Sequence, residues 1–258
     1  MSGILRTARA IASIAFLAVG TNTVFAGSHG KEVVQPSAVV EMFTSQGCSS
    51  CPPADKVLSE YAADKNVLAL SWHVDYWNYL GWKDTFSKAE FTERQQHYAV
   101  SFRRRGVYTP QAVVNGRDHV VGSRKSHIEK LMKTYNSTGE GLTVPLDVKL
   151  LGDRMRVSSA PGADTGKATL YVIYFDRKKS VSIKRGENRG REIEYHNIVR
   201  EVSMLGMAEG GKLDVSLPLA EMKRKGHDAC AIILQQSSSN GFPGPIIGAS
   251  VVNYLADS

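Results

Sequence analysis

Two cysteines separated by only two residues, Cys48 and Cys51, stand where a strand pattern changes into a helix pattern. Residues 38–43 form an apolar run that predicts a buried strand, and the apolar positions of residues 54–62 recur at helical spacing. These recurring positions are Ala54, Val57, Leu58, Tyr61 and Ala62. Because a strand that leads directly into a helix is typical of α/β proteins, we expect the cysteine pair at a helix N-terminus.

This position predicts the acidity of the pair. A helix N-terminus presents unpaired N–H groups and about half a positive charge, and it can lower a cysteine pKa from about 8.5 to about 3.5–7.5. Cys48, nearer the loop, is expected to be the exposed attacking thiol, and Cys51, one turn into the helix, the buried resolving thiol. The two serines between them add no charge, and the two prolines after Cys51 fit a first helical turn, where N–H donors are not needed.

Strand and helix patterns alternate between residues 37 and 136, in the order β-α-β-α-β-β-α. Asn115-Gly116 between two apolar runs predicts a hairpin. Ser126 and Glu129 form a capping-box pattern at the start of the last helix, and residues 136–139 have the composition of a linker. We therefore expect an α/β domain over residues 36–138, with a mixed sheet flanked by helices.

The second half of the chain shows short strand patterns without convincing helices. Their spacing predicts a β-rich, sandwich-like domain over residues 142–255. This domain can be an independent module or a lid packed on the first domain. The expected strands cover residues 144–151, 155–159, 168–175, 193–202, 213–217, 230–235 and 246–252.

Residues 1–26 have the pattern of a cleaved secretory signal peptide: Arg6 and Arg9, an apolar stretch, and small or aliphatic residues up to Ala26. The alternative is an uncleaved membrane anchor, but the apolar stretch is shorter than the roughly 18–20 residues that span a bilayer. The sequence predicts a secreted or periplasmic protein with no stable membrane insertion after signal cleavage.

The formal net charge falls from +7 to +5 when residues 1–26 are removed, because they hold two arginines and no acidic residue. Basic residues cluster at 103–105 and between 177 and 191, without the aromatic interleaving typical of nucleic-acid binding, so we expect a solvated surface and no nucleic-acid partner. The glycine-rich segment 184–191 can reach back to the edge of the sheet that carries the cysteines, although such charged loops are usually only solvated.

Three cysteines are too few for a disulfide scaffold, and in an oxidising compartment the Cys48/Cys51 pair can be a disulfide, a redox couple or a metal clip. Cys230 stands in an apolar run and is expected to pack in the core. The histidines show no ligand spacing with one another. We expect no metal site and no cofactor.

A second motif raises the specificity of the cysteine pair. Tyr108-Thr109-Pro110-Gln111 stands just before a predicted hairpin strand, and Pro110 follows Cys51 by 59 residues. Together with the strand that leads into the cysteines, this arrangement resembles the thioredoxin fold. The resemblance implies that Pro110 is a cis-proline facing the cysteine pair, and that Thr109 offers backbone groups to an extended, thiol-bearing substrate.

A closer resemblance covers nearly the whole mature chain. The string from Val40 to Asp55, Trp72-His73-Val74-Asp75-Tyr76-Trp77-Asn78 and Arg185-Gly186-Glu187-Asn188 are similar to a secreted bacterial family catalogued as a domain of unknown function with a thioredoxin-like fold. The resemblance implies a thioredoxin-like fold and export, and it brings no established activity. The chain departs from thioredoxins proper in its Ser-Ser dipeptide, in the aromatic connection after Asp75 and in the β-rich segment.

The aromatic connection, residues 75–84, follows a strand whose end should share a sheet edge with the cysteines. Trp77 can form a wall over Cys48, and Asp75 can assist proton transfer to Cys51. The alternative is that these aromatic residues pack against the second domain.

The leading functional hypothesis is thiol–disulfide exchange, in which the Cys48 thiolate attacks a substrate disulfide and Cys51 resolves the mixed disulfide. Its partners would be a thiol or disulfide substrate and a redox partner. Two alternatives stay open: a binding module with a structural Cys48/Cys51 disulfide, and a Cu(I)-thiolate carrier, since soft thiolates suit that ion.

Overall fold

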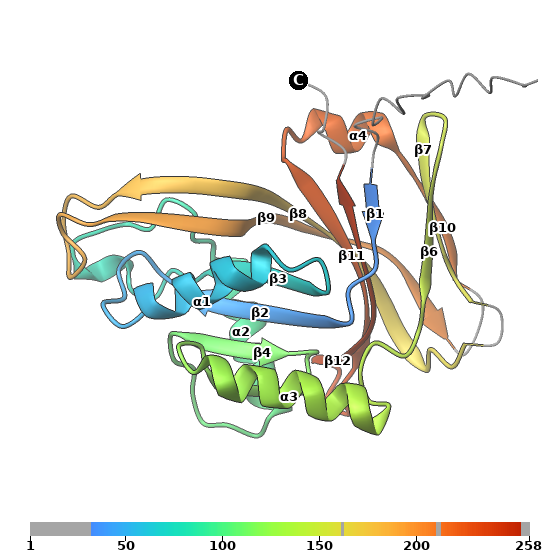
Figure 1. Ribbon diagram of the computed structural model, residues 1–258, viewed down its shortest axis with the longest axis horizontal. Coiled ribbons are helices and arrows are strands. Elements are labelled where there is room, and N and C mark those ends of the chain that lie inside the picture. The colour runs from blue at the N-terminus through green and yellow to red at the C-terminus, as the bar shows by residue number, and fades with distance from the viewer. Residues whose placement is uncertain (1–31, 161–162, 210–212, 254–258) are drawn as a thin grey trace, which may run out of the picture.

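The computed structural model describes residues 32–160, 163–209 and 213–253, so the predicted signal peptide lies outside the described residues. The protein is built on a mixed sheet of nine strands, in the order β1-β12-β11-β8-β9-β3-β2-β4-β5, beside a smaller sheet in the order β10-β7-β6 (Figure 1). The predicted α/β class with a mixed sheet and a β-rich C-terminal segment is confirmed, but the mixed sheet is larger than expected because it includes strands of the C-terminal segment.

Residues 38–138 supply one end of the large sheet. β2 (Ala38–Thr44) pairs in parallel with β3 (Val67–His73) and antiparallel with β4 (Gln111–Val114), which forms a hairpin with β5 (Asp118–Val121). The helices are α1 (Pro52–Ala62), α2 (Ala89–Ser101) and α3 (Lys125–Thr138). The predicted order β-α-β-α-β-β-α is confirmed for this part of the chain.

Burial on both faces explains the apolar run in β2. Val40 and Met42 pack in one cluster with residues of α1 and α3, whereas Val39 and Phe43 pack in another cluster with residues of α2. Since successive side chains of a strand point to opposite faces, a strand covered by helices on both sides needs apolar residues at nearly every position. The end of this strand, at Thr44, leads into the cysteines.

The C-terminal segment continues the same sheet. β8 (Lys167–Ser182), β9 (Glu192–Glu209), β11 (Ala229–Ser237) and β12 (Pro243–Asn253) are joined to β3 through one parallel pairing, Ser71 with Ile198. β1 (Glu32–Val34) pairs with β12 at the far edge. The smaller sheet consists of β6 (Leu146–Leu151), β7 (Arg154–Ser159) and β10 (Asp214–Pro218), and its apolar face packs on β8 and β11. The limits of the two predicted domains stay a prediction, but one sheet runs through both.

Several local predictions were wrong. The N-cap of α3 is Arg124 and has no side-chain cap, so Ser126 and Glu129 lie inside the helix and form no capping box. The helix continues through most of the predicted linker to Thr138, because Gly139 adopts a left-handed conformation with φ 73° that ends it. The sequence also missed the short α4 (Leu219–Arg224) and the 3-10 turn Asn78–Leu80.

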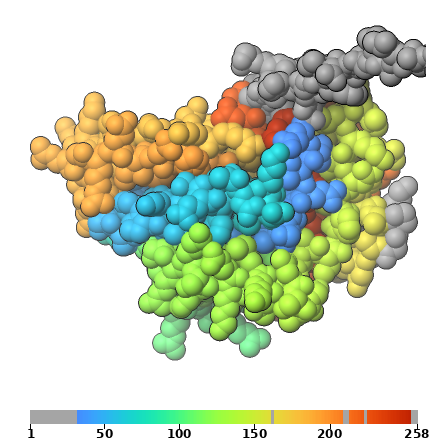
Figure 2. Space-filling view, in the orientation of Figure 1, coloured from blue at the N-terminus to red at the C-terminus, as the bar shows by residue number. Residues whose placement is uncertain are grey.

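The hairpin formed by β8 and β9 is longer than predicted, with strands of 16 and 18 residues. It runs beside α1 and projects at one end of the molecule (Figures 1 and 2, orange, at the left). Its loop therefore reaches the edge of the sheet where β2 ends. None of the helices in the described ranges is long and apolar enough to cross a membrane.

Candidate functional site at the start of helix α1

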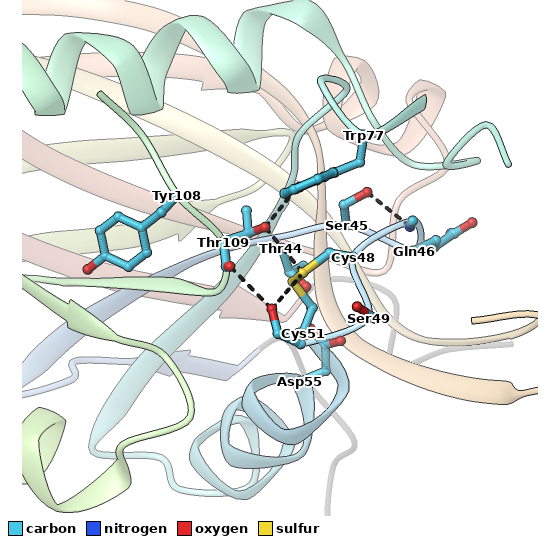
Figure 3. Close-up of a disulfide and its surroundings, with 12 residues drawn as sticks. Thr44, Ser45, Gln46, Cys48, Ser49, Cys51, Asp55, Trp77, Tyr108 and Thr109 are labelled. Atoms are coloured by element: carbon cyan, nitrogen blue, oxygen red, sulfur yellow. Dashed lines mark hydrogen bonds between the residues drawn. A yellow bond between two sulfur atoms is a disulfide. The ribbon is translucent and has the colours of Figure 1, made fainter. Parts of the chain in front are cut away.

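Cys48 and Cys51 form a disulfide in the loop between β2 and α1, with their Cα atoms 5.4 Å apart (Figure 3). The N–H of Cys51 donates to the carbonyl of Cys48, which closes a turn around the bridge. Residues 45–51, the cysteine loop, thus bring both sulfur atoms to the carboxyl end of a central strand. In open α/β sheets this is the edge at which ligands bind.

Cys51 is the N-cap of α1 and does not lie one turn into the helix as predicted. The helix begins at Pro52 and Pro53, which have no N–H, and the N–H groups of Ala54 and Asp55 both donate to the carbonyl of Cys51. The positive end of the α1 dipole therefore lies near Cys48, but the first turn of α1 has few free N–H donors. Hydrogen bonds to the sulfur must come from side chains.

Two hydroxyl groups lie against the sulfur of Cys48. Thr109 Oγ1 donates to Cys48 Sγ over 3.2 Å, and Ser50 Oγ lies 3.4 Å from the same sulfur. Trp77 Nε1 donates to Thr109 Oγ1 over 2.7 Å, which leaves the hydroxyl proton of Thr109 free to point at the sulfur (Figure 3). The peptide bond between Thr109 and Pro110 is cis, as the resemblance implied.

The expectation that Cys48 is exposed was wrong: Cys48 is 2% exposed and Cys51 is fully buried. Thr109 lies over the sulfur, and Trp77 packs against the cysteine loop so closely that a Cβ on Gly47 would lie 3.2 Å from Trp77 Cβ. Ser49 and Ser50, by contrast, are exposed. In this disulfide form, the sulfur atoms are approached past the two serines.

The structure separates the two residues proposed for the aromatic connection. Trp77 reaches the candidate site through Thr109, as described above. The carboxylate of Asp75 instead accepts from Thr92 Oγ1 over 2.6 Å, and its N–H donates to the same oxygen atom. Asp75 therefore ties the connection to α2 and has no hydrogen bond to either cysteine.

A buried carboxylate that the sequence did not single out lies one turn after Cys51. Asp55 is on the face of α1 that packs on the sheet, and its Oδ1 accepts from Thr44 Oγ1 over 2.7 Å. Its Oδ2 has no hydrogen-bond partner among the described residues. Burial raises the pKa of Asp55 from 3.8 to about 7, despite the hydrogen bond from Thr44 and the nearby His73. The spacing of four residues from Cys51, on the same helix face, is the signal that could have found it.

A second buried pair supports the cysteine loop. His73 Nδ1 lies 2.8 Å from Asp84 Oδ2, and Asp84 also accepts from the backbone N–H groups of Gln46 and Phe86. Burial opposes ionisation of Asp84, but His73 and these N–H groups outweigh it and lower its pKa. The pair fixes Gln46, two residues before Cys48, in place.

The loop of the β8–β9 hairpin also contacts the cysteine loop. Asn188 Nδ2 donates to the carbonyls of Gln46 and Cys48 over 3.0 and 2.9 Å, and Glu187 Oε2 accepts from the N–H of Ser49 over 3.3 Å. Gly186 has φ 75° and packs against Trp82 so closely that a Cβ on Gly186 would lie 3.1 Å from Trp82 Cβ. The prediction that this charged segment can reach the cysteines is confirmed by these contacts.

The third cysteine lies apart from this site. Cys230 is fully buried in β11, and burial raises the pKa of its thiol. Within residues 32–160, 163–209 and 213–253, no group of three or more His, Cys, Asp and Glu side chains is arranged to hold a metal ion.

The fold and the site together define a mixed α/β protein with a buried disulfide between a central strand and its helix. The chain belongs to the family described as "Protein of unknown function (DUF1223)", which matches residues 39–235. No curated protein matches the chain.

Two solved structures are similar to this chain. The crystal structure of protein AGR_C_4864 from Agrobacterium tumefaciens is 40% identical, covers 86% of this chain and 96% of its own, and has a TM-score of 0.78. HBP35 of Porphyromonas gingivalis is 16% identical, with 86% of this chain and 76% of that one covered and a TM-score of 0.58. The second likeness shows a shared fold alone.

Proposed function

We propose that the protein is an exported thiol–disulfide oxidoreductase with a thioredoxin-like domain, in which Cys48 and Cys51 exchange disulfides with a substrate. The observation that carries this proposal is the hydrogen bond from Thr109 to Cys48 Sγ. A hydroxyl donor held on one sulfur stabilises that sulfur as a thiolate, the species that attacks disulfides. Thr109 precedes the cis-proline, as in the fold that the sequence resembles.

In the reduced protein, the Cys48 thiolate attacks a substrate disulfide, forms a mixed disulfide and releases one substrate thiolate. The thiol of Cys51 then loses its proton and attacks the sulfur of Cys48, which forms the Cys48/Cys51 disulfide and releases the second substrate thiolate. Two electrons pass from the protein to the substrate, and the reverse sequence reduces the protein disulfide.

Asp55 is the group that accepts the proton of Cys51 in this scheme. Its carboxylate is buried one turn along the same helix face, and one oxygen atom is free of hydrogen bonds from the described residues. A pKa of about 7 allows it to take up a proton and release it again near neutral pH. Asp55 thus takes the proton-transfer role that the sequence suggested for Asp75, whose carboxylate accepts a hydrogen bond from Thr92.

A trapping experiment tests the proposal. A Cys51→Ser variant keeps the attacking thiol but cannot resolve the mixed disulfide, so it should accumulate covalent adducts with substrate thiols in the exporting cell. A Cys48→Ser variant is the matched control and should trap none. Absence of adducts with Cys51→Ser, when the variant is folded and reduced, would show that the bridge is structural.

A binding function is the second candidate, and a hollow of about 480 Å³ favours it. Arg94 borders the hollow and donates through its Nε to Glu41 and through its Nη2 to Tyr98 and Gln235, whereas its Nη1 donates to none of the described residues. The lining combines four aromatic residues with polar and charged side chains such as Glu90 and Gln236; the aromatic residues are Trp72, Phe91, Tyr171 and Phe242. Full biological activity of a Cys48→Ser, Cys51→Ser double variant would favour this candidate. Tight, stoichiometric uptake of Cu(I) by the reduced protein would instead support the third, a copper carrier.

A further inference from the structure

The loop that contacts the cysteines is strongly basic. Residues 183–191, the hairpin tip, contain four cationic side chains and one carboxylate: Lys184, Arg185, Arg189, Arg191 and Glu187. All four cations are exposed, and none forms an ion pair with a residue that the structure describes. The single carboxylate is turned to the N–H of Ser49. The hairpin tip therefore presents an excess of positive charge beside the disulfide.

The hairpin tip is held in place from two sides. Backbone hydrogen bonds join Ile183 to Arg191 and Gly190 to Ile183, and these bonds continue the ladder of the long antiparallel strands β8 and β9. On the other side, Asn188 is buried and donates to two carbonyls of the cysteine loop. The backbone that carries the cations on either side of Asn188 is thus held beside the cysteine loop, at the projecting end of the molecule in Figure 2.

A hollow of about 430 Å³ lies on the hairpin tip and is bordered by Lys184, Arg189 and Arg191. Glu192 borders it too, so the surface is not purely cationic, but three cations face one carboxylate. Glu194, the next acid along β9, is engaged by Lys178 and His196. The hollow is shallow and open to solvent, so the side chains that border it are accessible to a passing substrate.

Exposed ion pairs and single surface charges contribute little to folding, so the stability of the fold does not account for this arrangement. Like charges clustered beside a reactive group instead attract oppositely charged reactants and raise the rate of encounter. We infer that the hairpin tip is the substrate-recognition element of the disulfide site and selects thiol or disulfide substrates that carry negative charge next to the reacting sulfur. This inference rests on the proposed thiol–disulfide exchange.

Three small disulfides test the inference on the reduced full chain: glutathione disulfide, which is anionic, 2-hydroxyethyl disulfide, which is neutral, and cystamine, which is cationic. The oxidation rate of the protein is followed by tryptophan fluorescence, since Trp77 lies beside the cysteines. Each rate is divided by the rate of dithiothreitol with the same disulfide, which removes intrinsic reactivity. The normalised rate should be about tenfold or more higher for the anionic disulfide than for the neutral one, lowest for the cationic one, and the differences should shrink in high salt.

Two variants with the same change of charge locate the effect. Arg185→Gln with Arg189→Gln alters the hairpin tip, whereas Lys130→Gln with Lys133→Gln alters exposed lysines on α3. The tip variant should lose most of the preference for the anionic disulfide, and the α3 variant should keep it. Paired peptide disulfides with flanking glutamates or lysines then show whether the preference extends from small thiols to acidic polypeptide segments.

The outcomes separate the two proposals. Equal normalised rates for the three disulfides at low salt, or the same loss of preference in both variants, overturn the inference alone. No reaction with any of the three disulfides, under conditions where dithiothreitol reacts with each, overturns the proposed exchange activity and the inference with it.

Discussion

Replacement of Asp55 by Asn should stabilise the folded protein in a pH-dependent way. Asp55 is buried, and burial raises its pKa from 3.8 to about 7. Since one pKa unit corresponds to about 1.4 kcal/mol, the ionised carboxylate is disfavoured by about 4 kcal/mol in the folded protein relative to the unfolded chain. Asn keeps the acceptor oxygen for Thr44 and removes the charge.

The sign of the pH dependence follows from the raised pKa. Between about pH 4 and pH 7 the folded protein binds a proton that the unfolded chain has released, so the free energy of unfolding falls as pH rises through this window. Above about pH 7 Asp55 is ionised in both the folded and the unfolded wild type, so the folded wild type is destabilised by the whole of about 4 kcal/mol. The advantage of Asp55→Asn should therefore be near zero at about pH 4 and approach 4 kcal/mol at about pH 8.

Urea unfolding of the disulfide form at both pH values measures this difference directly. Asp153→Asn, at an exposed turn, is the control and should show no pH-dependent gain. An advantage of Asp55→Asn that is the same at both pH values would refute the account of a buried, proton-binding carboxylate. In the reduced protein, the same variant should also slow closure of the disulfide, because the proton acceptor for Cys51 is lost.

Three further predictions concern single side chains. Thr109→Val should raise the pKa of Cys48 by about one to two units, because a hydrogen bond to a charged group contributes about 1.5–3 kcal/mol. The ultraviolet absorbance of the thiolate, recorded against pH, measures this pKa, and an unchanged value would count against the Thr109 contact. Asn188→Ala should lower the free energy of unfolding by about 1–3 kcal/mol and speed alkylation of Cys48 in the reduced protein, and unchanged alkylation would contradict the anchoring of the hairpin tip. Cys230→Ala should cost about 1 kcal/mol in unfolding experiments and leave disulfide exchange unchanged; altered exchange rates would assign the third cysteine a role.

Hydrophobic periodicity and the Asn115-Gly116 turn were sufficient to predict the element order of residues 38–138, because β2, β3, β4, α1 and α2 each bury several side chains. Hydrophobic periodicity could not predict the pairing of β3 with β9. This pairing rests on one parallel contact between Ser71 and Ile198, and no local pattern encodes a contact over that separation. The outer part of β8, residues 176–182, was missed because it is stabilised by pairing with β9 and carries charged residues such as Lys178 and Lys179.

The cysteine pair was visible in the sequence, whereas its supporting groups were harder to predict. Asp55 interrupts the apolar face of α1, and its spacing of four residues from Cys51 is the one sequence signal for it; its burial and its bond from Thr44 come from the structure. The exposure predicted for Cys48 failed because the covering residues, Thr109 and Trp77, come from segments distant in the sequence. The position of Cys48 in a loop predicted an exposed thiol, whereas packing of distant segments buries it.

The reduction potential of the Cys48/Cys51 pair is the most direct test of the proposed exchange. Equilibration of the purified full chain with glutathione redox buffers, read out by the fraction of disulfide, gives its value. Our account predicts a potential between about −270 and −120 mV, the range of thioredoxins and of strongly oxidising exchange proteins. A potential below about −300 mV, typical of inert structural disulfides, would contradict it.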